Sequence, residues 1–144
     1  MRSRDFKFFA AANTVARLST WSELPREQTG SIIVLRNEII ATGYNRNKGN
    51  QLHGIFADRA GVPEAHVAHA ETSALSKLTK IYGWNWSLAQ KREFELMKIY
   101  VYRETNGGPA IARPCKICTL ALKHFGISQI YYSTDDGYAE EIWE

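Results

Sequence analysis

The chain has 144 residues, of which 44% are hydrophobic and 23% are charged. These values are ordinary for a soluble globular protein, and the sequence contains no internal repeat or low-complexity tract. The formal net charge of +3 permits a phosphate-bearing partner without requiring one, because nucleic-acid binders usually concentrate more charge on one face. The length predicts a single domain over residues 1–144 with enough chain to build a core.

Residues 1–18 contain no apolar run long enough for a secretory signal or a membrane span. We therefore expect a cytoplasmic, reducing setting and no membrane partner. The same stretch has an amphipathic pattern, with apolar residues at Phe6, Phe9, Val15 and Leu18 separated by good helix formers. It predicts a helix over residues 5–18.

The remaining elements follow from apolar runs and from the turn residues between them. Strands are expected over residues 31–35, 39–43, 98–102 and 129–133, the first two joined in a hairpin. Helices are expected over residues 68–82 and 115–125, with a further short helix within 84–97. Residues 45–63 are expected to be a long polar loop, and residues 138–143 are too short and acidic to assign. The order α-β-β-α-β-α-β predicts a layered α/β domain with a partly parallel sheet.

The chain has two cysteines, and both lie in the segment Pro114-Cys115-x-x-Cys118 at the start of an expected helix. A spacing of three residues places both thiols on the same side of that helix, and a helix N-terminus favours thiolates. In a reducing compartment such a pair is a metal-ligand pair, a redox site or a chance occurrence. Because zinc needs three or four ligands, a metal site requires another donor, and His69 in His69-Ala70-Glu71 opens another expected helix.

The combination of His69-x-Glu71 with Pro114-Cys115-x-x-Cys118 resembles the zinc-dependent cytidine/deoxycytidylate deaminase superfamily. The resemblance covers most of the chain. It implies a three-layer α/β/α fold, with a central mixed sheet and helices on both faces. It also implies a hydrolase that acts on the C–N bond of a cyclic amidine, requires zinc, and assembles as a homo-oligomer.

The same resemblance implies roles for individual residues. His69, Cys115 and Cys118 bind zinc, and Glu71 moves a proton from the activated water to the base and later to the leaving ammonia. The backbone amide of Ala70 contacts the base. The sequence Gly43-x-Asn45 implies a substrate contact for Asn45. Further substrate contacts are expected from a second set of side chains, Arg46, Arg113 and Tyr132.

The long segment between Asn45 and His69 makes deoxycytidylate deaminase-like proteins the nearest fit, so a dCMP- or CMP-like nucleotide is the expected substrate. Two alternatives remain open: a deaminase of single-stranded DNA or RNA or of an adenine or guanine base, and a non-catalytic zinc-stabilised binding module. His53 and His66 are expected to be solvent-exposed loop residues, with a second metal site as the alternative. Trp21 is a further candidate for reaching the pocket.

Overall fold

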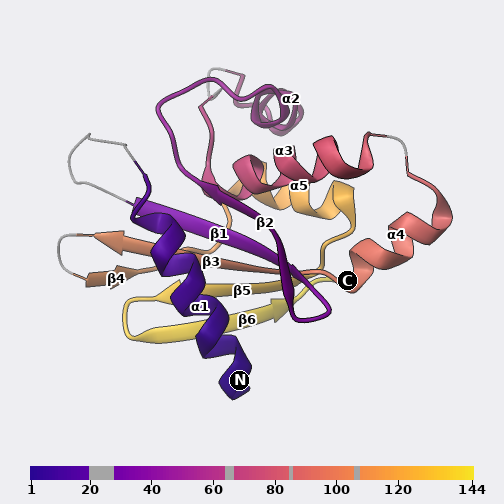
Figure 1. Ribbon diagram of the computed structural model, residues 1–144. Helices are drawn as coiled ribbons and strands as arrows, with labels where there is room; N and C mark the ends of the chain where they lie inside the picture. Colours follow the sequence, from indigo (N-terminus) through magenta and orange to yellow (C-terminus); the bar gives the residue numbers. More distant parts are fainter. Residues whose placement is uncertain (20–27, 64–66, 85, 106–107) are drawn as a thin grey trace.

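A computed structural model of the protein describes residues 1–19, 28–63, 67–84, 86–105 and 108–144. The helices are α1 (Ser3–Ala16), α2 (Gln51–Ala60), α3 (Ala70–Tyr82), α4 (Leu88–Glu95) and α5 (Lys116–Phe125). The strands are β1 (Gln28–Leu35), β2 (Glu38–Tyr44), β3 (Lys98–Thr105), β4 (Gly108–Ala110), β5 (Gln129–Thr134) and β6 (Gly137–Ile142). Within these ranges the strands form one sheet in the order β2-β1-β3-β5-β6, and β4 pairs with β3 (Figure 1).

The sheet is mixed. Strands β1 and β2, β1 and β3, β3 and β4, and β5 and β6 are antiparallel, whereas β3 and β5 are parallel. The parallel pair is joined through α5, which follows the usual rule that parallel neighbours need a helical crossover. The expected α/β class with a partly parallel sheet is therefore confirmed.

Helices cover both faces of the sheet, so the three-layer α/β/α arrangement is also confirmed (Figure 1). Helix α1 packs on one face through a cluster of buried residues, Phe8, Phe9, Ala12, Ala16, Ile32, Val34, Tyr100, Tyr102 and Tyr131. The larger core lies on the opposite face, where alternate residues of β1, β3 and β5 are buried in one cluster with residues of α2, α3 and α5. The side chains of Phe6 and Leu18, which the sequence pattern placed on the apolar side of the first helix, are exposed.

The hairpin between β1 and β2 turns at Arg36 and Asn37, both of which have positive φ angles of 50° and 67°. Two-residue hairpin turns of this kind require positive φ at both central positions, which asparagine tolerates better than most residues. The hairpin expected from the sequence is thus confirmed at the predicted turn.

The expectation of an irregular loop over residues 45–63 is wrong, because α2 lies within it. Asn50 caps this helix by accepting a hydrogen bond from the His53 backbone N–H at 2.8 Å, and Gly61 ends it in the left-handed conformation. The buried side of α2 faces α5 and carries Leu52, Phe56, Ala57 and Ala60. The unassigned residues near the C-terminus also form a regular element, the edge strand β6.

None of the helices in the described ranges combines the length and apolar character needed to cross a membrane.

The first turn of α3 lies directly against the sheet at Gly43 of β2. A Cβ atom at this glycine would overlap the backbone of Ala70 and Ala74. From the adjacent strand, the Ser31 hydroxyl donates a buried hydrogen bond of 2.8 Å to the carbonyl oxygen of Ala70. These two contacts fix the beginning of α3, and therefore His69 and Glu71, relative to β1 and β2.

Replacing Gly43 with alanine should push α3 away from the sheet. We expect the free energy of unfolding to fall by about 1–3 kcal/mol, as for other overpacked sites. Gly49→Ala is the matched control, because a Cβ there would have no neighbour within 4 Å, and its effect should stay within about 0.5 kcal/mol. Urea denaturation measures both variants, and equal midpoints for the two would contradict the close approach.

Candidate active site and metal centre

Two helix starts meet beside the carboxyl end of β3 and bring the sequence motifs together. His69 precedes α3 in an extended backbone conformation, and Cys115 precedes α5 in the same way. Cys115 caps α5, because its sulfur accepts a hydrogen bond from the Cys118 backbone N–H at 3.5 Å. Both helix N-termini therefore face the same point, where their partial positive charges favour bound anions and thiolates.

The imidazole of His69 lies between the two cysteine sulfurs. Its Nδ1 atom is 3.5 Å from Cys115 Sγ and 3.5 Å from Cys118 Sγ, and neither cysteine is in a disulfide. A tetrahedral zinc ion, with bonds of about 2.0–2.1 Å to nitrogen and 2.3 Å to sulfur, separates such donors by roughly 3.6 Å. One nitrogen and two sulfurs at these separations fit zinc in both chemistry and geometry.

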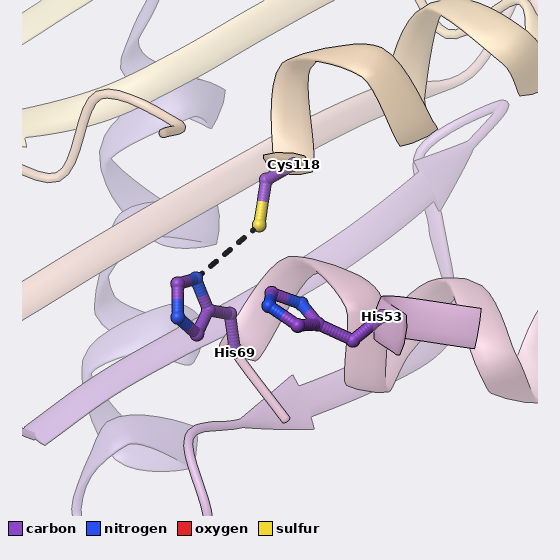
Figure 2. A group of neighbouring side chains, drawn as sticks. All are labelled: His53, His69 and Cys118. Carbon is purple, nitrogen blue, oxygen red and sulfur yellow. Dashed lines mark hydrogen bonds between the residues drawn. The ribbon is translucent and has the colours of Figure 1, made fainter. Parts of the chain in front are cut away.

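A second histidine lies close to this donor set. One donor atom from each of His53, His69 and Cys118 falls within 4.8 Å of the other two (Figure 2). His53 belongs to α2 and is fully buried, so the expectation that it is exposed to solvent is wrong. Its expected neighbour in a second metal site, His66, lies outside the described residues, as does Trp21.

Hydrogen bonding and burial act in opposite directions on the two thiols. The hydrogen bond from Cys118 lowers the pKa of Cys115 to about 3, with a further contribution from His69. Burial raises the pKa of Cys118 above its usual value. Zinc binds cysteine as thiolate, so metal binding at this site releases the proton that the pair holds.

Glu71 is the second residue of α3, and its side chain is only 5% exposed. Burial raises the pKa of its carboxyl group, and the neighbouring His69 opposes this rise only in part. A carboxyl group whose pKa is moved toward neutrality can both accept and donate a proton at working pH. The position and environment of Glu71 therefore suit a proton shuttle next to the metal ligands.

A pocket opens in front of these groups. Its lining consists of Thr29, Asn45, His69, Ala70, Glu71, Arg103, Ile111, Ala112, Arg113 and Cys115. Asn45 is held at the wall because its Oδ1 atom accepts a hydrogen bond of 3.0 Å from the Thr29 backbone N–H. The pocket thus combines two metal-ligand candidates, one buried acid, one amide side chain and two arginines, with the exposed Ile111 as an apolar wall.

Of the other predicted substrate contacts, Arg113 lies in the pocket lining and Tyr132 and Arg46 do not. Arg113 lines the pocket, but its guanidinium forms two hydrogen bonds to Glu141 of β6, at 2.6 and 3.1 Å. Tyr132 donates to the same carboxylate at 2.8 Å. The guanidinium of Arg46 lies over the ring of Tyr44. Neither Tyr132 nor Arg46 is among the described residues that line the pocket.

Sequence reasoning did not name Arg103 and expected His53 in an exposed loop, not buried next to His69. Arg103 follows Ile99 and Val101 at intervals of two on β3, and both of those residues belong to the core beneath α3 and α5. Extending the predicted strand beyond residue 102 would have placed Arg103 on the same face. His53 would have been found from the helical spacing of the apolar residues in α2.

The comparisons with known proteins agree with this geometry. A family model described as the cytidine and deoxycytidylate deaminase zinc-binding region matches residues 2–134. An uncharacterized deaminase encoded in the luxG 3′ region of Aliivibrio fischeri is 27% identical over 125 residues, which are 87% of this chain and 69% of that protein.

Two solved structures share the fold. The cytidine deaminase of Burkholderia pseudomallei aligns with a TM-score of 0.61 and 14% identity, over 99% of this chain and 93% of its own. The dCMP deaminase of cyanophage S-TIM5, in complex with dCMP and dUMP, aligns with a TM-score of 0.57 and 18% identity, over 92% of this chain and 82% of its own.

Removing one sulfur should remove the metal. We expect Cys118→Ser to lower zinc affinity by more than about 100-fold, since even the loss of an outer-shell partner of a metal ligand costs 10–100-fold. Glu71→Gln should leave zinc content at the wild-type level, because Glu71 is not one of the three donors. Metal analysis after dialysis against a chelator measures both, and full zinc retention in Cys118→Ser would rule out the proposed ligand set.

Proposed function

Because the chain belongs to the cytidine and deoxycytidylate deaminase zinc-binding family, we propose that it hydrolyses the exocyclic amine of a cytosine-containing nucleotide such as dCMP or CMP. The products are the corresponding uracil nucleotide and ammonia. The observation that carries this proposal is the joint placement of Glu71, His69 and Cys115 in one pocket with Asn45 and Arg103. A purely structural zinc site would not need a buried acid that lines the adjoining pocket.

When bound, zinc supplies a Lewis acid that makes a water molecule nucleophilic near neutral pH. In the proposed mechanism, the Glu71 carboxylate accepts a proton from that water and transfers it to the ring nitrogen of the base. The water oxygen bonds to the carbon that carries the amine. The same carboxylate then takes the remaining proton of the new hydroxyl group and delivers it to the amine, so that the C–N bond breaks and ammonia leaves. The raised pKa of Glu71 supports both transfers, because it lets the carboxyl group hold each proton on its way.

The chain supplies the remaining contacts in this proposal. The backbone N–H of Ala70 lies at the start of α3, next to the acid, and orients the base. The Asn45 side chain, fixed by Thr29, is positioned to hydrogen-bond the sugar or the base edge. Homo-oligomeric assembly stays a prediction from the family resemblance.

Arg103 is the best-placed cation for a substrate phosphate. It lies at the carboxyl end of β3, on the face that carries α3 and α5, and it lines the pocket. Its guanidinium reaches the edge of the pocket, where Nη1 contacts the carbonyl oxygen of Ile111 at 3.5 Å. Two helix N-termini add to the positive potential there, which favours an anionic group.

Arg113 is less available for the same role. Its two hydrogen bonds to Glu141 lower the pKa of that carboxyl group to about 2, so a phosphate would compete with a closely paired carboxylate. Fork-shaped pairing of this kind is among the stronger charged interactions of side chains. We assign the phosphate contact to Arg103 because of its place in the pocket beside two helix N-termini, and a supporting role in the pocket wall to Arg113.

The first test is a deamination panel with zinc-loaded protein. The substrates are dCMP, CMP, deoxycytidine, cytidine, adenosine, guanine and short single-stranded oligonucleotides. We expect turnover of dCMP or CMP, with kcat reduced about 10²–10⁴-fold in Glu71→Gln, the usual range for loss of a general acid or base. Glu95→Gln, an exposed position on α4, is the matched control. Ammonia release and product mass provide the measurement.

Other outcomes of the panel separate the alternatives. Turnover of oligonucleotides alone, with an affinity that falls steeply as salt is raised, would make the protein a polynucleotide deaminase. Turnover of guanine or adenosine alone would make the protein a purine deaminase. Zinc-replete protein without turnover on any substrate would favour the binding-module alternative.

The contribution of Arg103 is tested by comparing substrates with and without phosphate. In Arg103→Gln we expect kcat/KM for the nucleotide to fall about 10–100-fold, the effect of losing a hydrogen bond to a charged group, and kcat/KM for the nucleoside to change less. Arg92→Gln, an exposed position on α4, serves as control. An equal loss on both substrates would show that Arg103 does not recognise the phosphate.

A further inference from the structure

His53 is a fully buried histidine that the proposed chemistry does not use. It occupies the third position of α2, a helix that the family motif does not include. Its Nδ1 atom lies 2.9 Å from the Thr72 hydroxyl, across the junction between α2 and α3. Burying an imidazole without solvent is unfavourable unless its polar atoms are engaged, so this placement calls for a specific role.

Thr72 connects His53 to both sides of the metal centre. Its hydroxyl accepts a hydrogen bond from the His69 backbone N–H at 3.2 Å and lies 3.3 Å from the His69 carbonyl oxygen. Its backbone also forms a hydrogen bond to the sulfur of Cys118. A threonine hydroxyl has one proton and two acceptor sites. All three contacts of the hydroxyl are satisfied together when His53 donates through Nδ1–H and the hydroxyl donates to the His69 carbonyl.

The ring of His53 also packs against the ring of His69. Their centroids are 4.3 Å apart with an interplanar angle of 46°, and Figure 2 shows the His53 ring beside His69 and below Cys118. This contact restricts rotation of the His69 imidazole, whose Nδ1 must point at both sulfurs. The orientation of a metal-binding histidine is commonly set by such neighbours.

His53 lies behind the metal centre when viewed from the pocket. Among the described residues, the pocket is lined by His69, Glu71 and Cys115 but not by His53 or Cys118. A water activated for attack on a substrate has to be at the pocket side, next to Glu71.

Helix α2 is itself fixed to α3, so His53 is held in place. Asn50 caps α2 and donates through Nδ2 to the Ser76 hydroxyl at 3.1 Å. The apolar side of α2 is buried in the core that α3 and α5 share, through Leu52 and Phe56. A rigid support is what a residue needs if it is to orient another side chain.

We propose that His53 is a positioning residue of the zinc centre, which orients the His69 imidazole by ring contact and Thr72 by a hydrogen bond, and is not itself a ligand. The inference concerns metal binding alone and is independent of the substrate. It gives α2 a function, because the helix carries the group that holds the zinc-binding histidine.

The test measures zinc affinity by competition with a chromophoric chelator, and the absorption spectrum of the cobalt-substituted protein. We expect His53→Ala to bind zinc about 10–100-fold more weakly, as for other outer-shell partners of metal ligands. His53→Asn should bind more tightly than His53→Ala, because the asparagine amide reaches the position of Nδ1. His124→Ala, an exposed histidine on α5, should match the wild type.

A double-mutant cycle connects the effect to Thr72. Thr72→Val removes the hydroxyl while keeping the shape, and we expect it to weaken zinc binding as well. Combined with His53→Ala, it should cost less than the sum of the two single effects, since both remove the same hydrogen bond. Circular dichroism establishes that each variant is folded, and Thr72→Val carries the test if His53→Ala does not fold.

Two results would overturn the proposal. Wild-type zinc affinity in both His53→Ala and Thr72→Val would show that the hydrogen bond does not support the metal centre. A changed d–d spectrum of the cobalt protein at saturation in the His53 variants would show that His53 is a ligand. The proposal requires an unchanged spectrum, with two thiolates still bound, and a lower affinity.

Discussion

The contact of the first turn of α3 with strands β1 and β2 is the constraint on which the site depends. The absence of a side chain at Gly43 allows the helix backbone to touch the sheet. The Ser31 hydroxyl on β1 donates a hydrogen bond to the carbonyl oxygen of Ala70. Because interiors are close-packed, a helix seated in this way has little freedom to shift. His69 and Glu71, on either side of Ala70, therefore take their positions from the sheet and not from a flexible loop.

The second half of the centre depends on α5, whose start meets that of α3. Both helices direct their N-terminal partial charges at the donor set, which stabilises thiolates before any metal is considered. For the neighbouring Glu71, burial instead favours the neutral form of the carboxyl group. One small region thus favours the anionic form of the Cys115 sulfur and the neutral form of the Glu71 carboxyl group, since the two groups differ in burial and in hydrogen bonding.

The chemistry of the site was predictable from sequence because it sits in short motifs at helix starts, where spacing determines geometry. The supporting structure was less predictable. Helix α2 was missed because Gly54 and the surrounding polar residues are typical of a loop, although Leu52, Phe56, Ala57 and Ala60 have helical spacing. Strand β6 was missed because its sequence is short and acidic, with Glu140 next to Glu141 and few apolar residues. Such a composition is common in a solvated edge strand. The roles of Arg103 and Arg113 required tertiary structure, since only the fold shows that Arg103 lines the pocket and that Glu141 of β6 holds Arg113.

The pairing of Arg113 with Glu141 connects the pocket wall to the last strand of the sheet. The family model matches residues 2–134, and Glu141 follows that region in β6. A substitution in that last strand would release or recharge an arginine in the pocket wall without touching any metal ligand. Through Glu141, the last strand therefore sets the charge of the pocket wall although it contributes no residue to the pocket lining in the described part of the chain.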